Sequence, residues 1–537
     1  MKRQDERIAY LIALPAIILA FIFKLFPLVG AFKLPFIDYR ITTGMGGSNY
    51  IGFNNFSNLF SAYYFRRLVS NTFILKIGFV FLSGIIAFIL GIALSNIKKE
   101  WLRYTFVILF TIPFFIPVSV FCYMVLVILQ LHPLPFLPSI EQLLEPEWFR
   151  LIYIILESFR ASGILSIIVF YFIKTKGREG GTKRAIAAKA IALFLFVQLS
   201  SIMTVNFEML NEFISPLADS TADTLDTFIF KNGIINGDVN QASSIWFLRF
   251  IIQLPITIGV YYIIKNAYYE ELIDREDLEY DVEASYEVEL EAIKEEKSEY
   301  EESSKSWGVV ICLIYTLILI LPIVSILGID GDRTSYQFQN TAISTSFIRY
   351  IVLTFMAALL NFVITILLAY PLTISNSKDK IVYEIFLLIL LVSGQGGIHE
   401  YIYYKNLGFV NTVYPYVLNG FFSVMNIFVL GSIYTSQYPF SSFKKYIHRI
   451  YRPAIALAGL QFIGIWNSYY PSQILYLHNP KSFSPVMLFK SIVMDMQGGI
   501  EPSLLILGLL VSLPSIVIGI AICFLADNRV LISRMRD

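Results

Sequence analysis

The middle of the chain carries the acidic stretch Glu270-Glu-Leu-Ile-Asp-Arg-Glu-Asp-Leu-Glu-Tyr-Asp281, which continues to Lys305. It holds sixteen Asp and Glu residues against four bases, a balance of −12 in a chain whose total charge is +1. A like-charged run of this kind is typical of a disordered, self-repelling tether; recruitment of a basic cytoplasmic protein is the alternative. Because the sequence on both sides is apolar, we predict a first transmembrane domain over 1–268, an acidic cytoplasmic linker over 269–306 and a second transmembrane domain over 307–537.

The composition of the chain argues against a soluble globular protein and against a nucleic-acid-binding protein. Hydrophobic residues make up 56% and charged residues 15% of the 537 residues, and the mean hydropathy is +0.66, outside the range of soluble globular proteins. The bases outside the acidic stretch stand in short clusters between apolar runs, which indicates membrane topology rather than nucleic-acid binding. The three cysteines lie far apart in apolar runs, so we expect neither a disulfide framework nor a metal site or cofactor.

A helix needs about 20 mostly apolar residues to cross a bilayer. By this measure the sequence predicts twelve spans, six on each side of the acidic stretch, over residues 8–31, 72–96, 104–131, 150–173, 185–205, 245–265, 308–328, 347–374, 381–396, 413–436, 453–470 and 503–526. The predicted fold class is therefore an all-α polytopic membrane protein, arranged as two six-helix bundles.

The short basic clusters give the orientation of these spans. They fall on one face, together with both termini and the acidic stretch: Lys2/Arg3/Arg7, Lys98/Lys99/Arg103, Lys174/Lys176/Arg178/Lys183/Arg184, Lys378/Lys380, Lys444/Lys445/Arg449/Arg452 and Arg529/Arg534/Arg536. Because positive charge marks the cytoplasmic side, we predict cytoplasmic termini in a multi-pass protein of the cell membrane. The outer face then carries the longer segments 38–68, 132–149, 206–244, 397–412 and 471–502.

Each half contains its own series of short motifs, although the two halves are not obvious sequence repeats. In the first half they are Tyr10-Leu-Ile-Ala-Leu-Pro15, Phe23-Lys-Leu-Phe-Pro27, Ile51-Gly-Phe-Asn-Asn55, Asn71-Thr72, Ile112-Pro113, Asn206-Phe-Glu208, Ala222-Asp-Thr-Leu-Asp-Thr227 and Lys231-Asn-Gly-Ile-Ile-Asn-Gly237. In the second half they are Gly396-Gly-Ile398, Tyr401-Ile-Tyr-Tyr-Lys-Asn-Leu-Gly-Phe-Val-Asn-Thr412, Trp466-Asn-Ser468, Leu475-Tyr-Leu477 and Ser484-Pro485.

In these motifs the chain resembles the membrane-spanning permeases of binding-protein-dependent ABC importers for carbohydrates, which work as pairs of six-helix subunits. The resemblance covers nearly the whole chain except the acidic stretch, and it implies two half-permeases fused in one bacterial polypeptide. It also implies a translocation path between the bundles near the middle of the bilayer. An external solute-binding lipoprotein and separate ATPase subunits are the partners that it implies.

The chain departs from this family in its cytoplasmic loops. A permease of the family couples to its ATPase through a loop built around Glu-Ala-Ala followed by Gly. The corresponding segments here, 174–189 and 440–452, are short and basic, and neither contains that motif. The chain also has no Gly-x-x-x-x-Gly-Lys-Ser/Thr phosphate loop, so any ATPase must be a separate protein.

The candidate substrate-path residues are Trp466, Asn467, Glu157 and Arg160. An indole face stacks on sugar C–H groups and an amide binds hydroxyls, but an interfacial aromatic belt with a helix-end Asn explains the same pair. Glu157 and Arg160 lie three residues apart inside a span, where ionisable groups are costly and often functional. Mutual neutralisation with a structural purpose is the alternative.

The candidates for partner contacts lie at the two predicted faces. The external ones are Glu208, Asp223, Asp226, Asn232, His399 and Glu400; loop-structuring hydrogen bonds explain the first four equally well, and a solvated loop explains His399 and Glu400 better than a metal or proton site. The cytoplasmic ones are Lys444, Lys445, Arg449 and Arg452. They stand in an amphipathic basic helix over 440–452, which we interpret as a connector lying on the membrane with its aromatic residues at the interface.

Two functions are consistent with these features. The first is a fused permease that translocates a sugar or oligosaccharide delivered by an external lipoprotein. The second is a permease-derived membrane scaffold without ATPase coupling, which serves a surface lipoprotein or a polysaccharide-assembly complex. We expect no enzymatic activity, because no catalytic constellation stands out.

Overall fold

The computed structural model describes residues 2–40, 43–131, 138–176, 182–213, 217–267, 307–327, 340–373, 378–394, 397–434, 443–469, 479, 482–495 and 504–525. The acidic stretch therefore lies outside the described residues, and the domain boundaries at its two ends stay a prediction.

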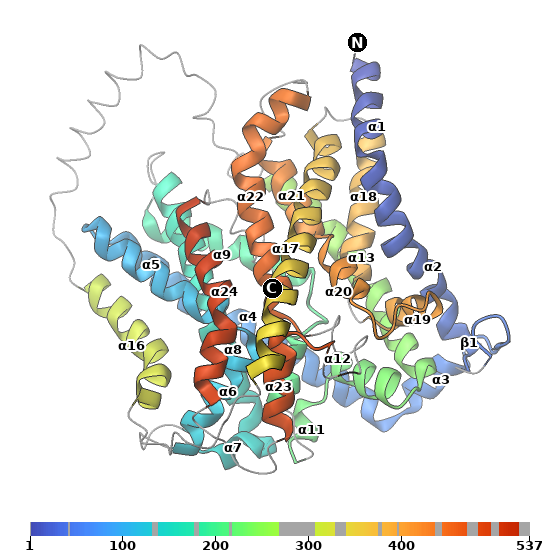
Figure 1. The fold of residues 1–537 in the computed structure, drawn as a ribbon, viewed down its shortest axis with the longest axis horizontal. Coiled ribbons are helices and arrows are strands. Elements are labelled where there is room, and N and C mark those ends of the chain that lie inside the picture. The colour runs from blue at the N-terminus through green and yellow to red at the C-terminus, as the bar shows by residue number, and fades with distance from the viewer. Residues whose placement is uncertain are drawn as a thin grey trace.

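Almost every described element is a helix (Figure 1). The first half contains α1 (Lys2–Ala20), η1 (Phe21–Leu25), α2 (Phe26–Lys33), η2 (Leu34–Phe36), β1 (Ile37–Asp38), β2 (Asn49–Tyr50), α3 (Asn54–Ser61), α4 (Tyr63–Ser95), α5 (Glu100–Phe115), α6 (Val118–Leu131), α7 (Ile140–Leu144), α8 (Pro146–Lys176), α9 (Lys183–Leu199), α10 (Phe207–Phe213), α11 (Asp219–Ala222), α12 (Leu225–Phe228), η4 (Ile229–Ile235) and α13 (Val239–Ala267). The second half contains α16 (Trp307–Leu327), α17 (Asn340–Ala369), η6 (Tyr370–Thr373), α18 (Lys378–Ser393), α19 (Ile398–Asn406), α20 (Tyr414–Gly420), α21 (Val424–Tyr434), α22 (Phe443–Asn467), α23 (Pro485–Asp495) and α24 (Leu504–Leu525). Strands β1 and β2 pair antiparallel, with Ile37 opposite Tyr50.

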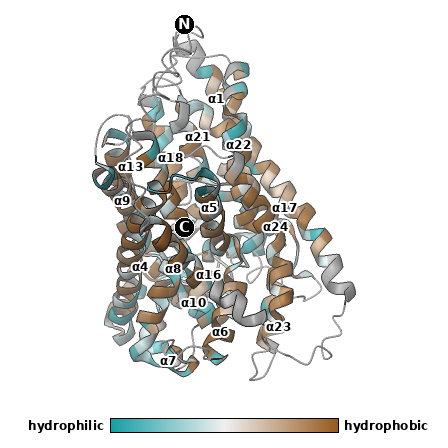
Figure 2. Ribbon diagram, turned by 90° about the vertical axis from the view of Figure 1, so that its left-hand side faces the viewer, coloured by the Kyte–Doolittle hydropathy of each residue, from teal (hydrophilic) through white to brown (hydrophobic). Residues whose placement is uncertain are grey.

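The all-α polytopic fold class is confirmed. Each predicted span overlaps a helix or a pair of consecutive helices, and apolar residues dominate the long helices (Figure 2). Within the described part of the chain, seven helices are long and apolar enough to cross a membrane, or up to nine if each of two bent pairs is one span. The count of twelve spans stays a prediction.

Two pairs of consecutive helices, one in each half, meet at a sharp bend. Helices α5 and α6 meet at 97°, and α18 and α19 meet at 91°. The first bend has a local cause, because Pro117 disfavours helical geometry at the preceding residue and Ile116 is extended, with ψ 133°. At the second bend Gly397 has a φ of +53°, a left-handed conformation that glycine adopts without steric cost.

The first described helix of each half packs against the other half, which we call the exchange of α1 and α16. Helix α1 of the first half packs on α17 and η6 of the second, while α16 of the second half packs on α4, α5 and α6 of the first. The last described helix of each half contacts the bent helix pair of the other half: α13 contacts α18 and α19, and α24 contacts α5 and α6. The contacts between the halves thus follow an approximate two-fold pattern.

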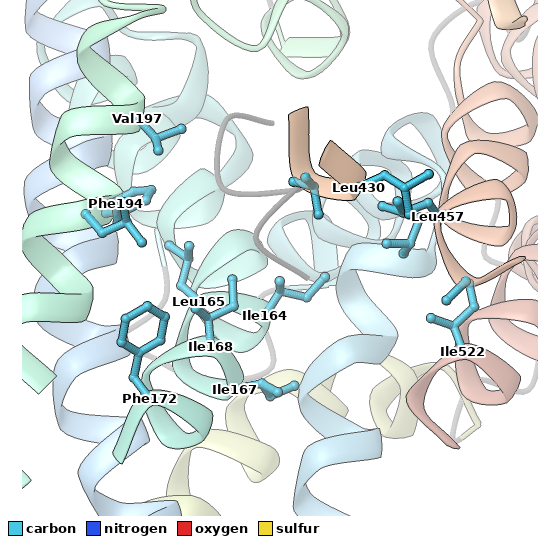
Figure 3. Close-up of a cluster of buried hydrophobic side chains, with 14 of the residues drawn as sticks. Ile164, Leu165, Ile167, Ile168, Phe172, Phe194, Val197, Leu430, Leu457 and Ile522 are labelled. Carbon is cyan, nitrogen blue, oxygen red and sulfur yellow. The ribbon is translucent and has the colours of Figure 1, made fainter. Parts of the chain in front are cut away.

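A hydrophobic core extends across both halves (Figure 3). Ile164 and Leu165 of α8 and Phe194 of α9 belong to the same buried cluster as Leu457 of α22 and Ile522 of α24. Between transmembrane helices the attraction comes from close van der Waals packing rather than from transfer out of water, and this shared cluster joins the halves independently of the acidic stretch.

Replacing Gly308 with valine tests the seating of α16 on the first half. A Cβ at Gly308 would lie 2.7 Å from the backbone oxygen of Ala93 on α4, so we expect a loss of about 1–3 kcal/mol from overpacking. The measurement is the thermal unfolding midpoint of the purified protein in detergent. The control is Gly259→Val, because nothing lies within 4 Å of a Cβ at Gly259; an equal loss in both variants would contradict the packing of α16 described above.

The interpretation of residues 440–452 as a connector lying on the membrane is wrong for its described part. Residues 443–452 are the first turns of the continuous helix α22. The ring of Tyr446 is 4.8 Å from that of Tyr370, and the hydroxyl of Tyr446 donates to the backbone oxygen of Ile366 at 3.2 Å. Ile450 is fully buried, so these apolar side chains face other helices of the second half.

Candidate functional site

Charged residues of both halves meet where α10 lies against the end of α22 and against α23. The carboxylate of Glu208 accepts hydrogen bonds from the hydroxyl of Ser468 and from the backbone N–H of Tyr469 at 3.1 Å. The hydroxyl of Tyr469 donates to the backbone oxygen of Glu208 at 3.0 Å. Glu208 was predicted as an external docking residue; its described contacts join the two halves.

An ion pair lies beside these hydrogen bonds. The ammonium of Lys490 is 2.7 Å from a carboxylate oxygen of Glu212, and the exposed fractions of the two side chains are 3% and 12%. Lys490 also donates to the hydroxyl of Tyr469 at 3.0 Å and lies 4.2 Å from the centre of its ring. Buried charges are stable only when paired and hydrogen-bonded, and this arrangement satisfies both conditions.

The predicted substrate-path residues Trp466 and Asn467 are the last two residues of α22, directly before Ser468. Trp466 is 1% exposed, and its indole N–H donates to the backbone oxygen of Val511 at 2.9 Å. The Nδ2 atom of Asn467 donates to the backbone oxygen of Phe115 at 2.9 Å, next to the bend between α5 and α6. The Oδ1 atom of Asn467 is buried without a hydrogen-bond partner. Trp466 is therefore part of the packed core, whereas Asn467 offers a free acceptor between the halves.

Glu157 and Arg160 do not form the isolated pair that their spacing predicts. No ion pair joins them in the part of the chain that the structure describes. Arg160 instead donates to the backbone oxygens of Phe114 and Ile116, at 3.4 and 3.1 Å, which the bend leaves without helical partners. Glu157 is 7% exposed and lies inside α8.

The acids predicted at the outer face are mostly tied to their own segment. The carboxylate of Asp223 accepts from the hydroxyl of Thr227 at 2.6 Å and is 4.0 Å from the ammonium of Lys231. Burial raises the pKa of the Asp223 carboxyl, while the hydrogen bond from Thr227 and the charge of Lys231 act against this rise. These contacts fix the shape of the segment, and they leave partner docking a proposal.

Asp226 and Asn232 also make contacts within the first half. Asp226 pairs with Arg249 of α13 and accepts from the backbone N–H of Val205 at 3.1 Å. The side chain of Asn232 accepts from the Nδ2 atom of Asn236 at 3.0 Å. Asp226 is therefore a buried structural anion, and Asn232 remains half-buried on its segment.

The interpretation of His399 and Glu400 as part of a solvated loop is wrong. They are 2% and 4% exposed because α19 turns back against the first half. The ring of His399 lies 4.8 Å from that of Trp246, and Glu400 pairs with Lys24 at 2.8 Å. A partner protein cannot contact these two side chains in this conformation.

The cytoplasmic candidates are only partly described. Lys444 and Arg452 are exposed on α22, and Arg452 donates to the hydroxyl of Tyr451 at 3.0 Å. The side chains of Lys445 and Arg449 lie outside the described residues.

Several residues at the junctions between the halves were not singled out from the sequence. They are Lys24, Glu212, Glu384, Lys265 and Lys490, which form three ion pairs between the halves: Lys24–Glu400, Glu212–Lys490 and Lys265–Glu384. The usable signal was an ionisable residue inside or beside an apolar run, but the partner of each one is 119 to 376 positions away in the sequence. Among the described residues there is no group of three or more His, Cys, Asp or Glu that could hold a metal ion.

The chain is similar to two proteins of Bacillus subtilis. No family model matches it. It is 23% identical over 288 residues to Protein LplB of Bacillus subtilis, an alignment that covers 48% of this chain and 88% of LplB. It is also 23% identical over 269 residues to the polygalacturonan/rhamnogalacturonan transport system permease protein YteP of the same organism, with 46% and 84% covered. This chain is related to sugar ABC transporter permeases.

These relatives are transport permeases rather than enzymes, and together with the apolar helices they indicate a multi-pass protein of the cell membrane. Two solved structures of a bacterial alginate ABC transporter are also similar. One is the transporter in complex with an alginate pentasaccharide-bound periplasmic protein, at 22% identity and a TM-score of 0.41. The other is the importer of alginate, an acidic polysaccharide, at 22% identity and a TM-score of 0.42. Each match covers 49% of this chain and 96% of the solved chain.

Proposed function

We propose that this chain is the fused permease unit of a carbohydrate ABC importer, and that it translocates a sugar or oligosaccharide delivered by an external lipoprotein. The observation that carries this proposal is the relation to LplB and YteP, because about half of this chain covers most of each relative. A chain of 537 residues has room for two such units. We assign it no enzymatic step.

The translocation path lies between the two halves in this proposal. Asn467 supports it, because its side chain reaches Phe115 of the other half next to the α5–α6 bend, and its Oδ1 atom, which has no hydrogen-bond partner, can accept a hydrogen bond from a sugar hydroxyl. The outer segments that contain Asp223 and Asn232 are the docking face for the lipoprotein. YteP is named for polygalacturonan and rhamnogalacturonan transport, so uronate-rich oligosaccharides are the first substrates to test.

A permease-derived scaffold is the second candidate, and the cytoplasmic connections favour it. Segments 174–189 and 440–452, where the family's coupling loops are expected, contain no Glu-Ala-Ala followed by Gly. The ATPase would have to contact another cytoplasmic surface, such as the one around Lys444 and Arg452.

Purification of the tagged protein from native membranes separates the two functions. The importer hypothesis predicts a stoichiometric ATPase subunit in the purified complex. It also predicts that right-side-out vesicles take up labelled oligogalacturonate only when ATP is enclosed inside them and the lipoprotein is present on their outer surface. Vesicles from cells lacking the chain are the control. Absence of both the ATPase and ATP-dependent uptake of any tested oligosaccharide would eliminate the importer and leave the scaffold.

A further inference from the structure

The contacts of α10 with α23 and with the residues that follow α22 are polar, as are two other ion pairs at the junction between the halves, Lys24–Glu400 and Lys265–Glu384. Most of that junction is apolar, as in the shared core of Figure 3. Here the contacts are an ion pair, Glu212–Lys490, and the hydrogen bonds of Glu208 with Ser468 and Tyr469. All of them join residues far apart in the sequence, one from each half.

Such a polar contact is suited to repeated separation. If two apolar surfaces part, water meets the full apolar area at about 25 cal/mol per Å². If a buried ion pair parts and water enters, hydration of the two ions offsets most of the lost attraction. The contact is therefore specific when closed, yet its opening is far less costly than opening an apolar interface of similar size.

The position of these residues indicates what their separation would uncover. Helices α6, α10 and α23 lie toward the end of the molecule opposite the N-terminus (Figure 2), and α10 and α23 belong to the predicted outer segments. Cys122 of α6 is 0% exposed and belongs to the same buried cluster as Met209, Leu210 and Phe213 of α10. The polar contacts of α10 therefore lie beside the cluster that holds a buried native cysteine.

We propose that Glu208, Glu212 and Lys490 form a latch that holds the outer ends of the two halves together and closes the junction around Cys122 to the outside. The closed latch follows from the contacts alone. Its opening as a step of transport rests on the proposed function.

The labelling rate of Cys122 tests the latch without ATP, sugar or partner proteins. The background chain carries Cys312→Ala and Cys523→Ala, so that Cys122 is the remaining cysteine of the three. Right-side-out vesicles are treated with a membrane-impermeant maleimide. Lys490→Met leaves Glu212 without its cation, and we expect labelling to accelerate about tenfold or more, because loss of one partner of a buried pair shifts the equilibrium toward the open form.

Two matched variants separate the latch from a general loss of structure. Lys405→Met removes an exposed lysine of α19, also in a predicted outer segment, and should leave the labelling rate unchanged. The charge exchange Glu212→Lys with Lys490→Glu should return the rate to within about threefold of the background. An unchanged rate in Lys490→Met, or an equal acceleration in Lys405→Met, would overturn the latch.

If Lys490→Met does not fold, Tyr469→Phe is the second variant. It keeps the ring but removes the hydroxyl that joins Lys490 to the backbone of Glu208, and we expect a several-fold faster reaction of Cys122. A rate equal to the background would overturn the latch in that case. If the variants change the labelling rate of Cys122 as expected but the protein takes up no oligosaccharide, only the proposed function is contradicted. If uptake is normal but the variants leave the labelling rate of Cys122 unchanged, only the latch is contradicted.

Discussion

Replacing Arg249 with methionine is expected to destabilise the folded protein by about 3–5 kcal/mol, the typical result of removing one partner of a buried ion pair. The side chains of Arg249 and Asp226 are 2% and 12% exposed. Methionine has a similar length and no charge, so the carboxylate of Asp226 would stay buried and would keep the hydrogen bond from the backbone N–H of Val205 but lose its cation. The expected consequence is a large fall in the thermal unfolding midpoint in detergent and in the yield of monodisperse protein.

An exposed ion pair in the same half provides the control. Arg40 and Asp38 are 3.2 Å apart, and their side chains are 68% and 36% exposed. Arg40→Met should change stability by no more than about 1 kcal/mol, because water screens and replaces such a pair. Adding Asp226→Asn to Arg249→Met should recover part of the loss by removing the unpaired charge. Equal effects of Arg249→Met and Arg40→Met would contradict the buried pair.

Replacing Gly163 with alanine is expected to have the second large effect. A Cβ at this position of α8 would lie 2.0 Å from the backbone oxygen of Phe110 on α5. A backbone atom of a packed helix cannot rotate away as a side chain can, so α8 and α5 must separate. We expect a loss of about 3 kcal/mol, at or beyond the upper end of overpacking effects.

The matched control for this variant is Gly259→Ala in α13. No atom lies within 4 Å of the added Cβ, and alanine is favoured over glycine in a helix by about 1 kcal/mol. The two changes add the same methyl group to a helical glycine, so their unfolding midpoints should move in opposite directions. A neutral Gly163→Ala would show that α5 and α8 are not in the close contact described here.

The absence of the family's coupling loops bears on both functional candidates. Segments 174–189 and 440–452 both lack the Glu-Ala-Ala motif of that loop. A fused permease must then contact its ATPase through other residues, and exposed Lys444 and Arg452 are the described bases nearest the expected position.

The helices themselves were predictable from the sequence, because the preference of a 20-residue apolar run for a bilayer is a local property. The bend at Pro117 also has a local cause, since proline restricts the residue before it. The burial of His399 and Glu400 had no such signal. Their hydropathy indicates a loop, and only the contacts with Trp246 and Lys24 account for their position.

The acidic stretch and the apolar runs on either side of it were thus enough to predict a polytopic helical protein. How the helices on the two sides of that stretch pack together was not contained in any local pattern. The exchange of α1 and α16, the pairing of Glu212 with Lys490 and the contacts of Arg160 with the α5–α6 bend arise when segments far apart in the chain pack together. Hydrophobicity and backbone preference act over a few neighbouring residues, whereas the partner of a buried charge is chosen by the packing of whole helices.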